Sequence, residues 1–338
     1  MANPQINEGA ATKPSPPSPA AQPGVSWASK LIGVQGPLIG LVVLCIFFSF
    51  STSGAFFSVR NGLNILDQVT VLGILSLGMT AVIISGGIDL SVGSVLAFAM
   101  MVMGWLSHDC GWPLVLAIVL GLIIGAACGL ANGFLVTRAK LPPFIATLSM
   151  MTVTRGLANI ITDGRQIVGY PAWFDSLATV RYLGFFSITV MLFIVLVILG
   201  WLHLGYRATG RSVYAIGGSP EVARLAGIRV RQLTTWVYVG AGILSALAGI
   251  VLASRLDSSQ PSAGLGYELD AIAAVVIGGA SLNGGVGGIA GTVVGVFIIG
   301  VLHNGLNLTG VSPFVQQVII GVVIALAVSS DTLRRRGA

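Results

Sequence analysis

The chain is organised as long apolar runs separated by short polar segments. The runs are continuous rather than alternating, which favours helices over the ~10-residue alternating strands of a membrane β-barrel. At about 20 residues per crossing, they predict about ten transmembrane helices. These spans are expected at 31–52, 63–84, 92–107, 114–136, 144–162, 187–204, 233–253, 268–282, 289–308 and 315–331. The expected fold class is therefore an all-α, polytopic membrane helical bundle.

Composition supports this class of protein. Hydrophobic residues make up 55% of the chain and charged residues only 8%, whereas about a quarter of a soluble domain is charged. The 46 glycines among 338 residues suit helices that pack closely in lipid, because small residues allow their backbones to approach.

The basic residues predict the orientation of the bundle. They lie in short loops rather than on one folded face, so they favour a topological role over nucleic-acid binding. With the N-terminus inside, the outer cations are Arg60, Arg165, Arg181 and Arg255. The cytoplasmic ones are Lys13, Lys30, Arg138, Lys140, Arg207, Arg211, Arg224, Arg229, Arg231, Arg334, Arg335 and Arg336. Both termini are thus predicted to be cytoplasmic.

Three regions follow from the same pattern. Residues 1–29 are rich in Pro, Ala, Ser and Gln, which predicts a disordered cytoplasmic tail. Residues 30–331 form the transmembrane domain, and 332–338 form a basic cytoplasmic tail.

Arg155 falls within the fifth apolar run, so we expect it to be paired, to snorkel or to face a polar cavity.

The polar loop 205–232 contains the signature of a short capped helix. Ser219 is a suitable N-cap, Pro220 suits the first helical position, and Glu221 complements the helix dipole. Gly227 can end the helix in a left-handed turn. A helix of about two turns has little stability of its own, so the pattern indicates docking to a partner surface.

A glycine-rich segment, GGIDLSVGS at 86–94, interrupts two apolar runs. Gly86 and Gly87 require a turn or a break there, and Asp89 followed by Ser91 offers local capping of the next helix. The alternative is a broken helix that lines a polar path, with its irregular backbone satisfied by protein or water. The residues alone favour the capped turn.

Faint internal repeats raise the question of duplication. Gly278 and Gly279 begin GGASLNGG, which echoes the first glycine-rich segment. A second echo is separate: Asn132-Gly133 precedes Pro143-Phe144, and Asn304-Gly305 precedes Pro313-Phe314. The distance from the glycine-rich segment to the Asn-Gly pair differs by roughly one helix between the two halves of the chain. Duplicated halves and chance matches therefore remain equally open.

Further polar residues have both a structural and a functional interpretation. Glu268 and Asp270 fit the first turn of a helix, where acids complement the dipole, and could instead form an outer-mouth ligand site. Asn304 could line a sugar path, although an amide inside a membrane more often bonds a neighbouring helix.

The sequence favours transport over catalysis. It lacks H-E-x-x-H, G-x-S-x-G and Walker-type motifs, and its three cysteines and three histidines show no metal-ligand spacing. We therefore expect no catalytic residue, metal or bound cofactor. An energised process then needs an external ATPase or an ion gradient, and most acids lie near span ends, which disfavours the gradient.

Three long motifs carry a resemblance to a known family. GGIDLSVGS, YAIGGSPEVARLAGI and ELDAIAAVVIGGASLNGGVGG, followed by HNGLNLTGVSPF, resemble the ribose-type sugar ABC importer permeases over nearly the whole chain beyond the N-terminal tail. The resemblance implies a permease dimer in the bacterial inner membrane. It also implies a cytoplasmic ATPase that holds ATP and Mg²⁺, a periplasmic solute-binding protein, and a monosaccharide or polyol substrate.

The same resemblance gives the short helix a role. Permeases of ABC importers insert a helix with a Glu-Ala-Ala pattern and a later Gly into a groove of the ATPase. Glu221, Ala223 and Gly227 match this pattern loosely, with Val222 at the second position. The expected coupling residues are Ser219, Pro220, Glu221, Val222, Ala223, Arg224, Leu225 and Gly227, with Arg207 and Arg211 beside them.

Two functions of different class follow. The leading hypothesis is an importer subunit that works by alternating access under the control of a separate ATPase. The alternative is a self-contained, gradient-driven carrier or channel. Loop 205–232 discriminates between them, because only a coupled permease needs a capped helix there.

Overall fold

The computed structural model describes residues 27–52, 54–182 and 184–336. Its helices are α1 (Trp27–Ser51), η1 (Ala55–Phe57), α2 (Val59–Ile84), α3 (Val92–His108), α4 (Leu114–Thr137), α5 (Pro143–Ile160), α6 (Ala172–Thr179), α7 (Ile188–Tyr206), α8 (Ala208–Gly218), α9 (Pro220–Leu225), α10 (Val230–Leu256), α11 (Tyr267–Ile277), α12 (Ile289–Leu308) and α13 (Pro313–Arg336). Two-residue strands β1 (Ile167–Val168) and β2 (Ser258–Ser259) pair antiparallel. The predicted helical fold class is confirmed.

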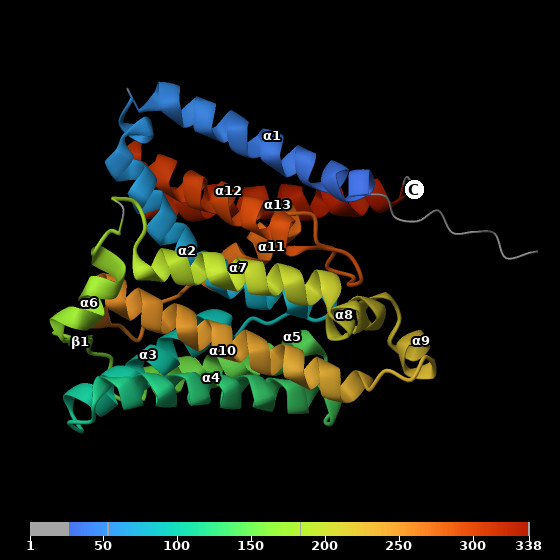
Figure 1. Cartoon of the computed structure of the whole chain (residues 1–338), viewed down its shortest axis with the longest axis horizontal. Helices are drawn as coiled ribbons and strands as arrows, with labels where there is room; N and C mark the ends of the chain where they lie inside the picture. Colours follow the sequence, from blue (N-terminus) through green and yellow to red (C-terminus); the bar gives the residue numbers. More distant parts are fainter. Residues whose placement is uncertain (1–26, 53, 183, 337–338) are drawn as a thin grey trace, which may run out of the picture.

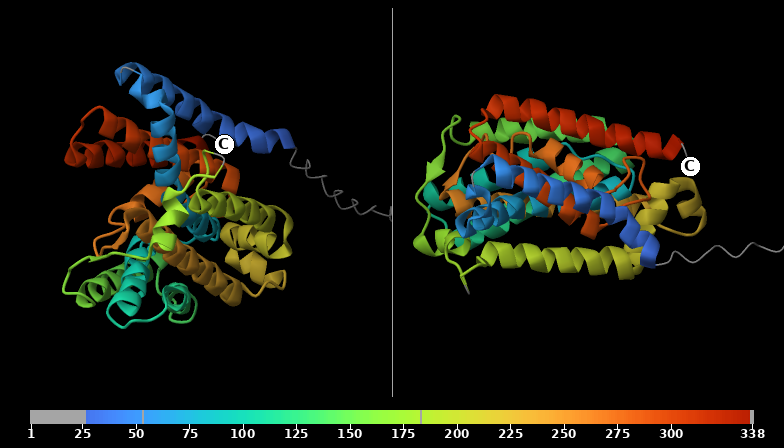
Figure 2. Two further views of the ribbon diagram at one scale, coloured as in Figure 1. Left: turned by 60° about the vertical axis from the view of Figure 1, so that its left-hand side comes forward. Right: turned by 90° about the horizontal axis from the view of Figure 1, so that it is seen from above.

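The long helices run roughly side by side between two ends of the molecule (Figures 1 and 2). One end carries α8 and α9 and is called the α9 end; the opposite end carries α6 and β1 and is called the α6 end. The start of α1 and the end of α13 both lie at the α9 end (Figure 1). This arrangement agrees with termini on one side of a membrane.

The boundaries of the two predicted tails differ from the structure. Residues 1–26 of the predicted N-terminal tail lie outside the described residues, but Trp27 already begins α1. At the other end, α13 continues to Arg336, so the basic residues extend the last helix instead of following it.

Five helices in the described part of the chain are long and apolar enough to cross a membrane: α2, α4, α7, α10 and α12. Shorter apolar helices lie at 35–51, in α3 and at 313–323. The predicted full span at 268–282 is wrong, because α11 ends at Ile277. Its 11 residues rise only about 16 Å, roughly half of a hydrocarbon core.

Burial separates inner helices from outer ones. The most apolar part of α2 is 83% buried, and the corresponding parts of α10 and α12 are each 72% buried. The corresponding values for α4 and α7 are 28% and 22%. Helices α2 and α10 pack against each other at the centre, so they form the core of the bundle while α4 and α7 face outward.

Glycines set the close packing of α4 on α10. Gly125, Gly129 and Gly133 recur every fourth residue of α4, where they share one face of the helix. A Cβ atom on any of them would overlap backbone atoms of α10 at 235–242. Side chains larger than hydrogen are therefore excluded along this contact, as in other membrane helix pairs with small residues at their interface.

The structure supports two inverted repeats, α2–α5 and α10–α13. Helix α2 runs from the α6 end to the α9 end, and α10 runs the opposite way (Figure 1). Each is followed by a re-entrant segment and a shorter helix, α3 or α11, and then by α4 and α5 or by α12 and α13. Duplication, which the sequence left open, is thus favoured.

The repeats exchange partners. Helix α2 packs against α11 and α12 of the other repeat, while α10 packs against α3 and α4. Within this scheme Asn132-Gly133 of α4 corresponds to Asn304-Gly305 of α12. The two glycine-rich segments do not correspond, because one lies before α3 and the other lies after α11. This difference explains the mismatch of one helix between the two echoes.

Candidate functional site

The two short helices begin against each other in the interior of the bundle. Gly93, in the first turn of α3, lies against the loop that leads into α11. A Cβ atom at Gly93 would overlap the Gly264 carbonyl oxygen and the Glu268 carboxylate. Both helices thus direct the positive ends of their dipoles toward this junction, which we call the half-helix junction.

A buried polar cluster holds the segment that leads into α3. Asp89 is only 2% exposed, and its Oδ1 accepts hydrogen bonds from the Ser91 backbone N–H at 2.8 Å and the Ser91 hydroxyl at 2.6 Å. Asn132 on α4 donates from Nδ2 to Ser91 Oγ at 2.8 Å. Asp89 therefore replaces helical hydrogen bonds at a break buried inside the protein.

The capped turn that the sequence favoured at 86–94 is only partly correct. Residues 85–91 do form a turn between helices, but Ser91 makes no side-chain capping bond to α3. Its hydroxyl is instead used by Asp89 and Asn132. The broken-helix interpretation, with an irregular backbone satisfied by protein groups, describes the segment better.

Two buried polar atoms beside this cluster have no hydrogen-bond partner among the described residues. They are Oδ1 of Asn132 and the hydroxyl of Tyr238, which lies so close to Gly87 that a Cβ atom there would overlap it. Buried polar groups usually form hydrogen bonds with protein or water. These two atoms are therefore able to form hydrogen bonds with a polar molecule at the junction.

Arg155 on α5 holds the second re-entrant segment. Its guanidinium donates to the backbone carbonyls of Pro261 and Ala263 at 2.6 and 2.8 Å, and it lies within electrostatic reach of Glu268. The sequence predicted a paired, snorkelling or cavity-facing arginine. The observed partners are mainly backbone carbonyls on the other repeat.

The two-stranded sheet of β1 and β2 closes the α6 end over the same segment. The Tyr170 hydroxyl donates to Ser259 Oγ at 2.6 Å, and Ser259 donates to the Met100 carbonyl on α3 at 2.8 Å. Burial raises the pKa of Tyr170 to about 12, so this hydroxyl stays protonated at neutral pH. These bonds therefore tie the start of the re-entrant segment to α3.

The remaining predicted polar residues bond between helices. Asp270, in the first turn of α11 beside Glu268, lies 3.1 Å from His303 Nε2 on α12, a pairing that sequence spacing did not reveal. Asn304 and Asn61 exchange two amide hydrogen bonds of 2.9 Å between α12 and α2. The structural interpretation of Asn304 is thus confirmed, and its amide is occupied.

Helix α9 forms where the sequence placed it. Ser219 Oγ accepts a bond from the Val222 N–H at 3.3 Å, Pro220 is the first helical residue, and Gly227 has φ +83°. Ala223 faces inward, whereas Val222 and Leu225 are 64% and 86% exposed. The predicted caps are confirmed, and the helix presents two apolar side chains to solvent.

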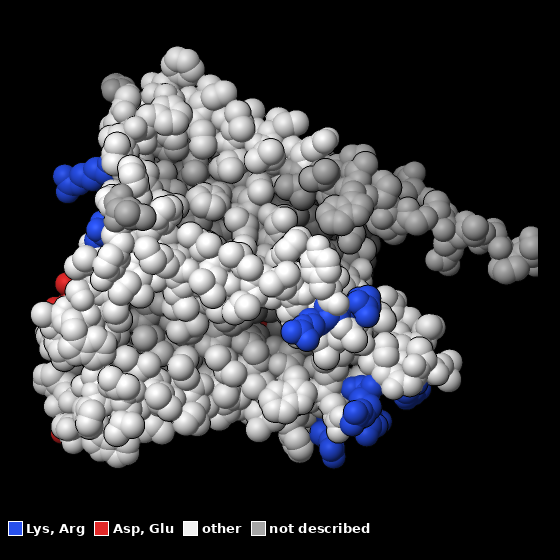
Figure 3. Space-filling view, viewed as in Figure 1, with Lys and Arg blue, Asp and Glu red and all other residues white. Residues whose placement is uncertain are grey.

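Basic residues surround this apolar surface. Figure 3 shows Lys and Arg gathered at the α9 end. The exposed basic side chains in and around α8 and α9 are Arg138, Lys140, Arg207, Arg211, Arg224, Arg229 and Arg231. An apolar patch within a basic surface complements a partner that is acidic around an apolar groove.

Helix α8, which the sequence did not predict, links α9 to both helix breaks. A Cβ atom at Gly217 would overlap the Ile84 carbonyl oxygen at the end of α2 and the backbone nitrogen of Gly285. Gly285 itself donates to the Ile84 carbonyl at 2.8 Å. The Tyr214 hydroxyl donates to the Gly287 carbonyl at 2.9 Å.

The glycines of the second glycine-rich segment serve this contact. Gly278 packs so closely on Gly291 that a Cβ atom would overlap the Gly291 carbonyl, and Gly279 has φ +94°. Gly86, with φ +82°, lies next to Gly217 on the other side. These positions therefore define a close junction between α8, the end of α2 and residues 278–288.

Fold and site together define a multi-pass membrane protein built around opposed half-helices. In the described residues, no group of three or more His, Cys, Asp or Glu could hold a metal ion. A family model described as the permease component of the branched-chain amino acid transport system matches residues 61–328. The chain belongs to this family of transport permeases.

Individual relatives match most of the chain. It is 48% identical to the ribose import permease RbsC of Bacillus subtilis, over 88% of this chain and 92% of that relative. It is 42% identical to RbsC of Escherichia coli K12, over 89% and 94%. The fructose import permease FrcC of Rhizobium meliloti is 38% identical, over 89% and 85%. No solved structure matches the chain.

Proposed function

We propose that this chain is the transmembrane subunit of an ATP-binding-cassette importer for a monosaccharide or related polyol. The observation that carries the proposal is α9, a capped helix with exposed Val222 and Leu225 at the basic end of the molecule. The relatives named as ribose and fructose import permeases support the substrate class.

A separate cytoplasmic ATPase supplies the energy in this proposal. Val222 and Leu225 enter an apolar groove of the ATPase, which alone binds ATP and Mg²⁺, and the surrounding arginines contact acidic groups at its rim. Burial of these two side chains offsets the cost of ordering such a short helix. The gradient-driven carrier is disfavoured, because it gives no role to an exposed capped helix.

Motion of α9 has a direct route to the interior. Helix α8 directly precedes it and packs against Ile84, Gly285 and Gly287. A displacement of α8 therefore shifts the end of α2 together with residues 278–288, which join α11 to α12. Both half-helices then move relative to each other, which is the rearrangement that alternating access requires.

The half-helix junction is the proposed sugar path. It combines two helix N-termini with polar side chains that donate and accept hydrogen bonds, as a hydroxylated ligand requires. The unpartnered Asn132 Oδ1 and Tyr238 hydroxyl are additional contacts for such a ligand. Its position inside the bundle matches the location of substrate sites in transporters with inverted repeats.

The complete importer contains further components. We propose two copies of this chain in the bacterial inner membrane, each with cytoplasmic termini. A periplasmic solute-binding protein delivers the sugar at the α6 end, and the ATPase docks at the α9 end. The positively charged α9 end faces the cytoplasm under the positive-inside rule.

Co-purification tests the proposal. The tagged chain is extracted from its native host in mild detergent, and co-eluting proteins are identified for wild type and for a variant with 220–226 replaced by Gly and Ser. The matched control replaces the exposed turn 162–165 at the α6 end in the same way. An ATPase should elute with wild type and control, and be lost from the 220–226 variant.

Uptake measurements complete the test. Ribose, fructose and xylose are offered as labelled substrates to cells that express each variant together with the native partners. We expect the 220–226 variant to insert normally and to lose at least about nine-tenths of uptake, because the coupling contact is gone. Retention of uptake, or lack of any associated ATPase in wild type, would favour the gradient-driven carrier.

A further inference from the structure

His303 of α12 links the half-helix α11 to α13. Its Nε2 lies 3.1 Å from Asp270 Oδ2 in the first turn of α11, and the amide of Gln316 in α13 is a hydrogen-bond partner of the same ring. Asp270 and Gln316 are only 8% and 6% exposed. The imidazole is therefore held between two buried polar groups that belong to two other helices.

The orientation of the Gln316 amide is fixed by its other contacts. Its Nε2 donates to Asn307 Oδ1 at 2.8 Å and to the Val311 carbonyl at 2.9 Å. A primary amide nitrogen carries two N–H donors, and a backbone carbonyl can only accept, so these bonds identify the nitrogen. The atom that remains for the imidazole is the amide oxygen, which is an acceptor.

Two acceptors around one ring define the charge of that ring. A neutral imidazole has a single N–H, whereas an imidazolium donates from both nitrogens. The Asp270 carboxylate and the Gln316 amide oxygen are satisfied together only by the doubly protonated form. His303 in this form also supplies the cation that a buried carboxylate requires.

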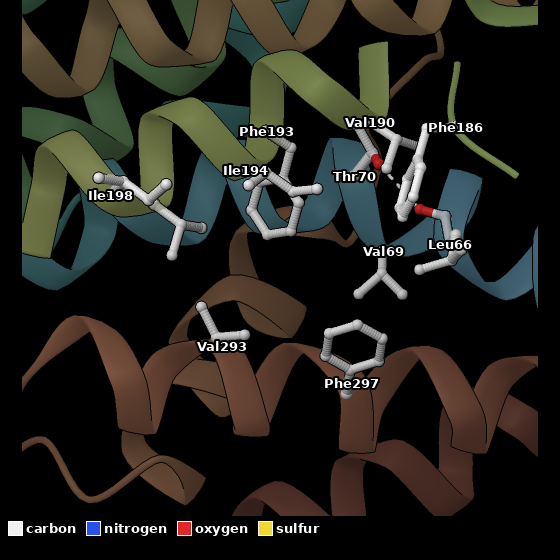
Figure 4. Close-up of a pocket in the computed structure, with 11 residues that line it drawn as sticks. Leu66, Val69, Thr70, Phe186, Val190, Phe193, Ile194, Ile198, Val293 and Phe297 are labelled. Carbon is white, nitrogen blue, oxygen red and sulfur yellow. Dashed lines mark hydrogen bonds between the residues drawn. The ribbon is translucent and has the colours of Figure 1, made fainter. Parts of the chain in front are cut away.

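Among the described residues, Asp270 is the one charged group that acts on this ring. The side of α12 toward α7 is apolar: Val293 and Phe297 face Phe193 across a cavity whose lining contains no ionisable residue (Figure 4). Other ionisable side chains described on the helices that pack against α12 are not partners of the ring. They are Cys45, Arg60, Asp67, His203, Tyr206, Tyr267 and Glu268.

The Asp270–His303 pair lies next to the half-helix junction. Asp270 follows Glu268 by two residues, and the Glu268 carboxylate meets Gly93 of α3. The Asp270 backbone N–H donates to the Gly266 carbonyl at 3.1 Å. A bond at the Asp270 side chain therefore fixes the turn of α11 that faces α3.

We propose that His303, in its imidazolium form, is a positioning residue for the sugar path. It holds the first turn of α11 against α3 through Asp270, and Gln316 anchors the ring to α13. This role rests on the proposed function of the half-helix junction as that path. Removal of the proton at high pH leaves one acceptor without a donor and Asp270 without its counter-charge, so α11 is released and transport falls.

A pH profile of uptake tests this role. The complex of this chain with its ATPase is reconstituted in vesicles that contain ATP, with the solute-binding protein and labelled ribose, fructose or xylose outside and equal pH on both sides. Wild type is compared with His303→Gln/Asp270→Asn, in which neither side chain titrates. The ratio of their uptake rates cancels the pH responses of the partners, and it should fall at least about threefold between about pH 6 and about pH 9.

Single variants separate the charge of the pair from its shape. His303→Gln leaves the Asp270 carboxylate without a cation and should lower uptake at least about fivefold at about pH 6, whereas the added Asp270→Asn should restore at least about half of wild-type uptake. The matched control is His108→Gln, because His108 is exposed and lies 3.5 Å from Asp109 Oδ1. This control should leave uptake and its pH profile unchanged.

Hydrogen exchange gives a measurement that does not need transport. In detergent, peptides that cover 264–272 should exchange at least about threefold faster in His303→Gln than in wild type, and at the wild-type rate in His108→Gln. A constant uptake ratio across the pH range, or wild-type exchange in His303→Gln, would overturn the role of His303. Lack of sugar uptake by wild type would overturn the sugar path instead, and the exchange rates would still show whether His303 positions α11.

Discussion

At the scale of single residues, Asp89 supplies hydrogen bonds that a continuous helix would take from its own backbone. Its buried Oδ1 accepts two hydrogen bonds from Ser91, and Ser91 in turn accepts one from Asn132. A buried donor that loses its acceptor costs about 1–3 kcal/mol. The side chain therefore contributes to stability whether or not a ligand occupies the junction.

We expect Asp89→Ala to lower the free energy of unfolding by about 1–3 kcal/mol, because it leaves the Ser91 N–H and hydroxyl without their acceptor. Asp89→Asn should lose less, since its amide oxygen can still accept from the Ser91 N–H. Unfolding of both variants in the same detergent gives the comparison. Equal stability of Asp89→Ala and wild type would contradict this account.

At the scale of elements, the distance between half-helices depends on glycine. A Cβ atom at Gly93 would overlap the Gly264 carbonyl oxygen and the Glu268 carboxylate, so no larger side chain fits there. A Cβ atom at Gly62 of α2, by contrast, meets no atom within 4 Å. The two glycines lie in helical segments of the same repeat, so they form a matched pair of positions.

Gly93→Ala should therefore lower stability by about 1–3 kcal/mol through overpacking and reduce uptake at least about tenfold by separating α3 from α11. Gly62→Ala should stay within about 1 kcal/mol of wild type and transport normally. Stability in detergent and uptake of labelled sugar are measured on both variants. Normal uptake by Gly93→Ala would show that the close contact is unnecessary.

At the scale of the whole molecule, the two ends differ in charge and in their proposed compartments. Cys110 is exposed just beyond the end of α3 at the α6 end. Gln232 is exposed at the start of α10, near α9. These positions report the side of the membrane on which each end lies.

In spheroplasts, a membrane-impermeant maleimide should label Cys110 readily, because the proposed orientation places it outside. In a Cys110→Ser background, Gln232→Cys should react only after the membrane is permeabilised. Labelling is quantified by mass shift, with full reaction in detergent as the control. The reverse pattern would invert the orientation and place α9 outside, where no ATP-driven partner could reach it.

The sequence by itself determined the elements whose cause is local. Continuous apolar runs specified membrane helices, and Ser219, Pro220 and Gly227 specified the start and end of α9, because caps act on adjacent backbone groups. The long motifs also indicated the family, which is confirmed by the permease model matched over residues 61–328 together with the ribose import permeases that match most of the chain. Gly86, Gly87 and Asp89 indicated a break between two helices. They did not indicate that this break is buried inside the protein.

Only the tertiary structure decided which residues meet across long separations. Gly93 contacts Gly264, Arg155 binds the carbonyls of Pro261 and Ala263, and Asn61 pairs with Asn304. In an apolar chain, lipid-facing and protein-facing surfaces have the same composition, so periodicity cannot identify partners. These contacts form because helices of each inverted repeat pack against helices of the other repeat. That arrangement depends on the packing of the whole chain.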